Sequence, residues 1–272
     1  MAILDGAEKI VDEWLGLSGV RIGAEPQYQH PTTLNRLAEK PFRAMSFNLV
    51  QRLLCHAQNR VNSGNGNPGQ SNWIFRQVPN MEEGNGAEIT LERTLIGKLP
   101  TNGPRSWGNM TPVASGVCKP MSDGRMAVDL VEVENSTVTL IELKIEANTP
   151  LFAAIEILGY GLCYMVARAC PNSFGCEPDL PLFNGKQHLK LRVLAPLAFY
   201  KGNGHLDWLK AFETRINRDL NSLDLPFRFD DIGYDIDFGF ETFPLEFNWV
   251  GNREHHAAAV QAFLARRSPF SA

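Results

Sequence analysis

Residues 125–145 read Arg125-Met-Ala-Val-Asp-Leu-Val-Glu-Val-Glu-Asn-Ser-Thr-Val-Thr-Leu-Ile-Glu-Leu-Lys-Ile145. Both halves of this stretch are rich in β-branched residues and alternate in polarity, which is typical of β-strands. Asn135 and Ser136 separate the halves, and two such polar residues between strands predict a tight turn. The sequence therefore predicts an antiparallel hairpin with arms at 125–133 and 137–145.

The position of this turn fixes which residues face each other. Residues pair across the hairpin when their numbers sum to 271, so Asp129 is expected opposite Glu142, with Cβ atoms roughly 4.5–5.5 Å apart. Lys144 lies two residues beyond Glu142 and projects from the same face. The other face is expected to be apolar and to carry Val128, Leu130, Ile141, Leu143 and Ile145.

A helix and a buried strand are predicted directly after the hairpin. Thr149 and Pro150 supply an N-cap and a first-turn proline for a helix that continues to about Arg168. Leu189 to Phe199 is a largely apolar run, typical of a strand buried on both faces. The order strand, strand, helix, strand predicts an α/β fold with a mixed sheet.

The remaining segments are assigned from periodicity and turn residues. Helices are predicted at 7–17, 33–58 (interrupted near Pro41), 208–220 and 252–267, strands at 88–99 and 227–247, and irregular connections at 62–70 and 101–120. The row Asp235, Asp237 and Glu241 is interpreted as the solvent-facing side of the last strand. No linker divides the chain, so we predict a single domain over 1–272.

The convergence of two carboxylates and an amine on one face carries the chemistry. Like charges this close repel, and a folded protein keeps them together only with a cation or a proton between them. Mg²⁺ prefers oxygen ligands and accepts one or two carboxylates together with waters and phosphate oxygens. Lys144, beside two carboxylates, is expected to stay charged and to act as an electrostatic partner of a phosphate.

The segment Ala-Val-Asp129, with twelve residues before Glu142-Leu143-Lys144, resembles the D…ExK core of the PD-(D/E)XK nuclease superfamily. The resemblance covers about 125–199. It implies a restriction-endonuclease-like mixed central sheet flanked by helices, with a nuclease-like core at about 88–200. It further implies a metal ion held by Asp129, Glu142 and the backbone carbonyl of Leu143, with Lys144 assisting hydrolysis.

Three further positions relate the chain to that superfamily. Glu156-Ile-Leu-Gly-Tyr160, on the helix after the core, resembles the Q-x-x-x-Y element of RecB-like and phage-exonuclease members, with Glu in place of Gln. Val128 stands where the family motif has proline. Many members carry a glutamate on the helix before the first core strand, and Glu39 is the candidate for that role.

Composition limits the partners and the compartment. The net charge of −4 provides no overall positive field for nucleic acid, so such a partner needs a local basic patch. Arg105 and Trp107, in the connection before the hairpin, are candidate substrate contacts. The five cysteines are scattered, and Cys163 falls in an apolar helical pattern. With neither a signal-peptide pattern nor a run of eighteen apolar residues, we expect a cytoplasmic protein that does not bind membranes.

The expected function is hydrolysis of phosphodiester bonds in nucleic acid with Mg²⁺ or Mn²⁺, with DNA favoured over RNA, and a homodimer is compatible with it. Three alternatives stay open: a catalytically silent nuclease-like module that binds nucleic acid or a protein, a metal-free sugar- or nucleotide-binding protein, and a solvated surface cluster at the hairpin. The Gly64-x-Gly66-x-x-Gly69 string follows a helix, and His255 and His256 point about 100° apart on a helix, so neither predicts a site.

Overall fold

The computed structural model describes most of the chain. The described residues are 4–17, 27–64, 72–79, 86–113, 126–146, 148–174, 176, 180–201, 205–223, 235–244, 260, 263–265 and 267–270.

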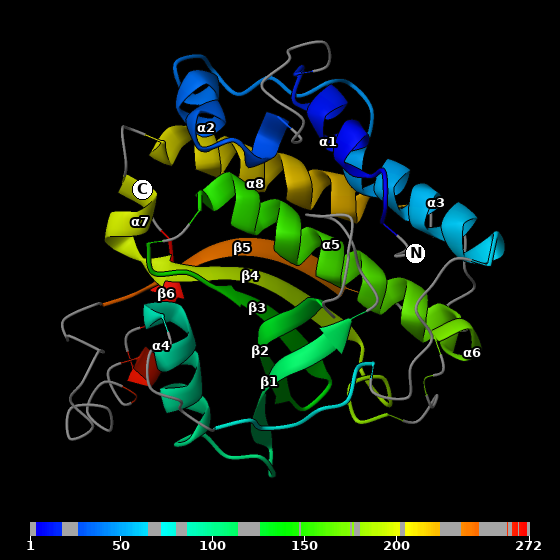
Figure 1. Ribbon diagram of the computed structural model, residues 1–272, viewed down its shortest axis with the longest axis vertical. Helices are drawn as coiled ribbons and strands as arrows, with labels where there is room; N and C mark the ends of the chain where they lie inside the picture. The colour runs from blue at the N-terminus through cyan, green and yellow to red at the C-terminus, as the bar shows by residue number, and fades with distance from the viewer. Residues whose placement is uncertain are drawn as a thin grey trace.

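A six-stranded mixed sheet forms the centre of the molecule (Figure 1). Its strands, in spatial order, are β1 (Arg105–Val113), β2 (Met126–Glu134), β3 (Thr137–Leu143), β4 (His188–Pro196), β5 (Asp235–Phe243) and β6 (Ser268–Pro269). The first three strands are antiparallel, β3, β4 and β5 are parallel, and β6 is antiparallel to β5. The α/β class and the mixed sheet are therefore confirmed.

Helices cover both faces of this sheet. The helical elements are α1 (Glu8–Trp14), η1 (Gln27–Gln29), α2 (Pro31–Ala38), α3 (Leu49–Asn62), α4 (Ala87–Ile96), α5 (Pro150–Ala169), α6 (Pro171–Phe174), α7 (Leu197–Lys201) and α8 (Leu206–Asn221). In Figure 1, α5 and α8 lie on one face with α1, α2 and α3 beyond them, and α4 lies on the other face.

The hairpin turn and the helix after it form as predicted, but the predicted pair of Asp129 with Glu142 lies beyond the last paired residues, Leu130 and Ile141. Leu130 pairs with Ile141 and Val133 with Val138, which is the predicted register. Asn135 turns the chain with a φ of +51°, a conformation that asparagine tolerates. The Thr149 hydroxyl accepts a hydrogen bond from the Phe152 N–H at 3.1 Å and so caps α5.

Two hydrophobic cores lie on opposite faces of the sheet. On one face, α5 and α8 pack against residues that include Val131, Val138 and Leu140. On the other face, Leu130, Ile141, Leu143 and Ile145 pack with α4 residues and with Trp107. The hairpin is thus buried on both faces, and the alternative of a solvated surface hairpin is wrong.

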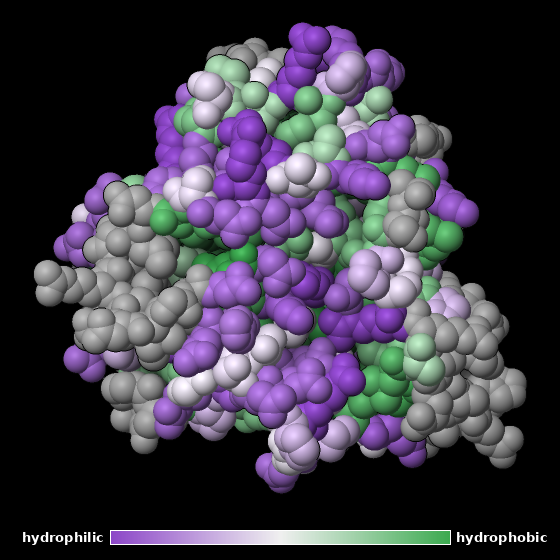
Figure 2. Space-filling view, turned by 180° about the vertical axis from the view of Figure 1, so that it is seen from behind, coloured by the Kyte–Doolittle hydropathy of each residue, from purple (hydrophilic) through white to green (hydrophobic). Residues whose placement is uncertain are grey.

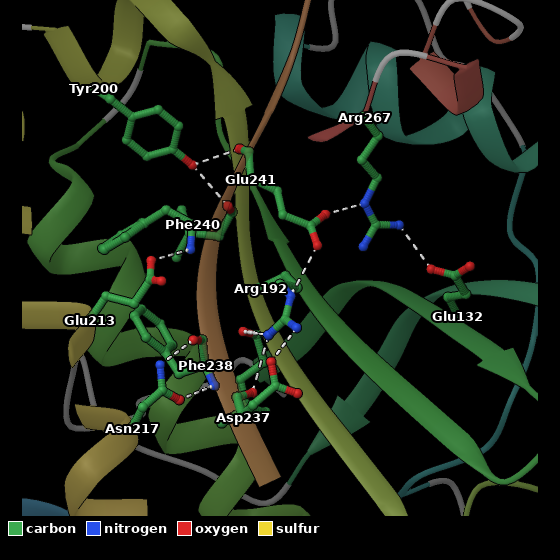
Figure 3. Close-up of polar contacts among 12 residues, drawn as sticks. Glu132, Arg192, Tyr200, Glu213, Asn217, Asp237, Phe238, Phe240, Glu241 and Arg267 are labelled. Atoms are coloured by element: carbon green, nitrogen blue, oxygen red, sulfur yellow. Dashed lines mark hydrogen bonds and ion pairs between the residues drawn. The ribbon is translucent and has the colours of Figure 1, made fainter. Parts of the chain in front are cut away.

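A row of alternating charges crosses the open part of the α4-side face (Figure 3). Glu132 on β2 pairs with Arg267, which also pairs with Glu241 on β5; Glu241 in turn pairs with Arg192 on β4. Arg192 also pairs with Asp237. Asp235, Asp237 and Glu241 alternate with the buried Ile236, Phe238 and Phe240, so the predicted polar side of this strand is confirmed. Asp237 and Glu241 are in addition ion-paired, and the network ties the segment before β6 to the sheet.

Two segments before the hairpin were predicted wrongly. Residues 88–99, predicted as a strand, form α4 instead, because Leu91 and Leu95 are one turn apart and both are buried, with Gly97 ending the helix. The 101–120 connection, predicted as irregular, contains β1, and its residues beyond Val113 lie outside the described part.

Other boundaries differ in smaller ways. Helix α3 begins after Asn48, whose side chain accepts the Gln51 N–H, so the second segment of the predicted 33–58 helix starts well past Pro41. Helices α1 and α8 lie near their predicted positions, and β5 lies within the predicted 227–247 strand. The remainder of that strand, and most of the predicted 252–267 helix, fall outside the described residues.

Helix α5 is long and apolar enough to cross a membrane, but 94% of its most hydrophobic window is buried inside the fold. Its composition is explained by packing against β3 and β4, and Cys163 is buried there as predicted. The face in Figure 2 is mainly hydrophilic, with green areas that are separate from one another. These features favour a soluble protein; the cytoplasmic location stays a prediction.

A close approach between α5 and β4 gives a test of the packing that holds α5. A Cβ on Gly161 would lie 2.6 Å from Cδ1 of the buried Leu191. Gly161→Ala is expected to lower the free energy of unfolding by about 1–2 kcal/mol, because overpacking outweighs the better helix propensity of alanine. Urea denaturation measures this loss. When Leu191 is already replaced by alanine, Gly161→Ala should no longer lower the free energy of unfolding. An equal loss with Leu191 and with Ala at position 191 would contradict the close packing of Gly161 against Leu191.

Candidate active site

Glu142 and Lys144 lie together at the carboxyl end of β3. The Lys144 Nζ is 2.5 Å from Glu142 Oε1, and Lys144 and Glu142 are only 6% and 2% exposed. The Lys144 N–H donates to the Leu194 carbonyl at 3.0 Å, which holds this end of the chain against β4. Because both backbone and side chain are fixed, the ammonium is directed at the carboxylate instead of reaching solvent.

Asp129 joins this pair where the β2–β3 ladder ends. The last paired residues are Leu130 and Ile141, and beyond them the Asp129 Oδ2 accepts the Leu143 N–H at 2.9 Å. Val128, predicted on the same face as Leu130, packs instead in the core that contains α5, which is a correction to the predicted alternation. The strands lose regular pairing at Asp129, so its carboxylate takes the place of a backbone acceptor.

Helix α5 brings Glu156 and Tyr160 to the same cluster. Glu156 is 8% exposed and its Oε2 lies 3.9 Å from Lys144 Nζ. The Tyr160 hydroxyl donates to Glu156 Oε1 at 3.1 Å. This is the i to i+4 contact expected for two residues one turn apart on a helix. The structure therefore places Glu156 near Lys144 and Tyr160 against Glu156.

Helix α4 adds two carboxylates that the sequence pattern did not reveal. Glu88 Oε1 accepts the Ile145 N–H at 3.0 Å, and its charge acts on Asp129. Glu92, one turn further, accepts a hydrogen bond from the buried Asn109 amide at 2.6 Å. The predicted strand at 88–99 hid these two glutamates. Their spacing, Glu88-x-x-x-Glu92, is the feature of the sequence that could have revealed them.

Glu39 was the sequence-based candidate for the glutamate on the helix before the first core strand. Glu39 is exposed at the end of α2, and the helix before β1 is α4, so that assignment is wrong.

Burial raises the pKa of three carboxyls at this site, Asp129, Glu142 and Glu92. For Asp129, loss of solvation is the largest cause, and it raises the pKa to about 6 although Lys144 and the Leu143 N–H oppose the change. Burial and the charges of Asp129 and Glu156 raise the pKa of Glu142 well above its ordinary value. The Glu92 pKa rises to about 7, mainly through burial and then through Asp129. The cluster therefore tends to hold protons or to attract a cation.

The pKa of Lys144 also rises, but for an amine a raised pKa favours the charged form. Burial alone would lower its pKa, but the charges of Glu142, Asp129 and Glu156 outweigh burial and raise it above the ordinary value. The side chain is therefore an ammonium at neutral pH, as its sequence context predicts. It can neutralise charge and donate hydrogen bonds, and it is a poor free-amine base.

The donor set suits a hard divalent cation. Among the described residues, Glu142 Oε2 is buried without a hydrogen-bond partner, and an unpaired buried carboxylate oxygen is costly unless something binds it. Glu142 and Asp129 supply carboxylate oxygens, and Leu143 between Glu142 and Lys144 supplies a backbone carbonyl. In the described part, no three His, Cys, Asp or Glu side chains form a metal-binding group, but Mg²⁺ requires only one or two carboxylates.

Other predicted contacts do not reach this cluster. Trp107 is 1% exposed and packs against Phe263, so it cannot serve as a free substrate contact. Arg105 forms an ion pair with Glu132, which also pairs with Arg267 on the α4-side face of the sheet. His255, His256, Gly66 and Gly69 lie outside the described residues.

Comparison of the chain with protein-family models, with curated proteins and with solved structures found no significant match.

The raised pKa of Asp129 predicts how stability depends on pH. A carboxyl whose pKa is about 6 in the folded protein and 3.8 ordinarily stabilises the fold below about pH 4, and this contribution is lost as the pH rises through about 6. Asp129→Asn keeps an acceptor for the Leu143 N–H but cannot ionise. Its Tm should equal that of the wild type at pH 4 and exceed it by on the order of 5 °C at pH 8.

Thermal melts across this pH range in metal-free buffer measure the effect. Glu134→Gln is the matched control, because Glu134 is an exposed carboxylate on the same strand, and it should show no gain. A Tm for Asp129→Asn that stays below the wild-type value at pH 8 would mean that ionised Asp129 stabilises the fold.

Proposed function

We propose that the protein is a metal-dependent phosphodiesterase of the PD-(D/E)XK type that hydrolyses nucleic acid, with DNA favoured over RNA. The observation that carries the proposal is the grouping of the partly buried Asp129 with the buried Glu142 and Lys144, in which one oxygen of Glu142 lacks a partner among the described residues. A lone ion pair of Glu142 with Lys144 does not require the carboxylate of Asp129 beside it. A site that binds a divalent cation through one or two carboxylates accounts for both acids.

The arrangement of elements supports a restriction-endonuclease-like fold. The helix before the first strand of the core, α4, carries Glu88, whose charge acts on Asp129. The helix after β3, α5, carries Glu156, which lies near Lys144, and Tyr160, which donates to Glu156. The PD-(D/E)XK superfamily, which the chain resembles, has further site residues on the helices at these two places. The match between these helices and the superfamily is additional support, because the sequence pattern of the hairpin does not specify either helix.

In this proposal Asp129, Glu142 and the Leu143 carbonyl hold Mg²⁺ or Mn²⁺. The bound ion would lower the pKa of a coordinated water and neutralise charge on the phosphate. Lys144, held as an ammonium, stabilises the negative charge that develops on the phosphate. Glu156 keeps Lys144 in place, and the Tyr160 hydroxyl fixes the orientation of Glu156. Burial strengthens each of these electrostatic contacts, because little water screens them.

Cleavage assays with labelled single- and double-stranded DNA and RNA test the proposal. The wild type should cleave one of these substrates with Mg²⁺ or Mn²⁺ and lose activity when EDTA removes the metal. Asp129→Ala and Lys144→Met should each reduce the rate by at least on the order of 10²-fold, since each removes electrostatic stabilisation of the transition state. The exposed-carboxylate variant Glu134→Gln should keep wild-type activity.

Metal binding separates the roles of the two residues. Titration calorimetry with Mn²⁺ should show binding to the wild type, none to Asp129→Ala, and binding at least as tight to Lys144→Met, since that variant removes a positive charge from the cluster. Binding should also raise Tm, by an amount set by the Mn²⁺ concentration relative to Kd. Loss of Mn²⁺ binding in Lys144→Met would contradict the division of roles.

The alternatives predict different combinations of these results. A catalytically silent module would bind nucleic acid or a protein but show neither cleavage nor Mn²⁺ binding. A metal-free sugar- or nucleotide-binding protein would have a Tm that ignores divalent ions and rises with a small ligand. Either outcome contradicts the proposed function.

A further inference from the structure

A second surface feature lies apart from the carboxylate cluster. A groove with a cavity volume of about 670 Å³ is bounded by the end of α1, by α2, by residues 39–43 and by Trp208 on α8. Helix α2 and the start of α8 lie at the upper left of Figure 1, and the carboxyl ends of β3 and β4 point to that same side. The groove and the candidate active site therefore lie toward the same end of the molecule.

The floor of the groove is apolar and rigidly supported. Phe42 is half-buried, and its ring centroid lies 4.9 Å from Trp208, 5.6 Å from Trp14 and 6.0 Å from Phe212. The remaining apolar lining comes from Leu15, Leu17, Leu37 and Pro41. Because aromatic packing fixes Phe42 from behind, the floor presents a firm apolar surface to whatever enters.

The rim of the groove is cationic. Arg36, Lys40 and Arg43 are exposed and line the groove, and among the described residues none of them has an ion-pair partner. Three other arginines of the helical layers are ion-paired: Arg52 with Glu13, Arg60 with Asp5 and Arg215 with Asp219. Among the described lining residues, Glu39 is the single acid. The groove therefore carries a local positive charge on a chain whose net charge is −4.

We propose that this groove binds a single strand of nucleic acid, with phosphates on Arg36, Lys40 and Arg43 and with bases against the floor formed by Phe42 and its apolar neighbours. Basic grooves with aromatic surfaces are suited to single strands, because unstacked bases reach the apolar floor while the backbone follows the cations. A duplex keeps its bases stacked inside and would meet only the rim. The choice of nucleic acid over another polyanion rests on the proposed nuclease function.

Binding to a short labelled oligo(dT) strand, measured by fluorescence anisotropy with the full chain in EDTA, tests the groove without the metal site. Arg36→Gln combined with Arg43→Gln should weaken binding at least ten-fold at low salt. The slope of log K against log salt should shrink by about 1.4, for two lost phosphate contacts. Arg218→Gln, an exposed arginine of α8 outside the groove lining, is the matched control and should bind normally.

The nucleic acid itself distinguishes base contacts from general attraction. A strand of abasic sites should bind on the order of ten-fold more weakly than oligo(dT), and a duplex of the same length should also bind more weakly. Equal binding of the abasic strand, tighter binding of the duplex, or no effect of the double substitution overturns the proposal. Binding of polyglutamate in place of any oligonucleotide overturns it in favour of an acidic protein partner.

The outcomes for the groove and for the catalytic site are separable. All binding is measured without metal, so an inactive Asp129 site leaves the oligo(dT) result intact. Conversely, if the groove does not bind, the Mn²⁺-dependent cleavage of short substrates and its loss in Asp129→Ala remain. A melt of the double variant that matches the wild type shows that any loss of binding does not come from unfolding.

Discussion

The burial of like charges at the carboxyl end of β3 is the constraint on which the site depends. The charges of Asp129, Glu142 and Glu156 act on one ammonium, Lys144. Glu142, Glu156 and Lys144 are buried, and Asp129 is partly buried. Such an arrangement costs stability unless a cation or protons offset the repulsion. The surrounding elements support it: the end of the β2–β3 ladder frees Asp129 to accept a backbone N–H, α5 supplies Glu156, and α4 supplies Glu88. A bound divalent ion would offset the repulsion between these carboxylates, and the repulsion thus relieved would contribute to the affinity for the ion.

Local patterns were sufficient to predict the centre of the fold. The hairpin register follows from the two-residue turn at Asn135, and the capped helix from Thr149 and Pro150, because each is set by residues adjacent in sequence. The parallel placement of β4 beside β3 agrees with a helix connecting them. Consequently the amino-acid sequence alone was enough to place Glu142 and Lys144 together.

The parts that were mispredicted depend on contacts between distant segments. Residues 87–96 contain Ile89, Thr90 and Thr94, which favour strand locally, but packing of Leu91 and Leu95 under the sheet makes them helical. That error hid Glu88 and Glu92 and left Glu39 as a false candidate. Val128 lies beyond the last β2–β3 pair, Leu130 with Ile141, and packs in the other core. The ion-pair partners of Asp237 and Glu241 on the polar side of β5, Arg192 and Arg267, come from other segments. The hydrophobic periodicity of one segment does not reveal which residues of a distant segment will contact it.

We propose that Asp129 and Glu142 share one divalent cation, and anomalous diffraction from crystals grown with saturating Mn²⁺ tests this proposal. We expect one strong peak bonded to oxygens of both side chains and to the Leu143 carbonyl, at about 2.0–2.3 Å, and no such peak in Asp129→Asn. A site that stays without a peak at saturating Mn²⁺, with Lys144 still paired to Glu142, would contradict the account and leave the cluster as a buried ion pair.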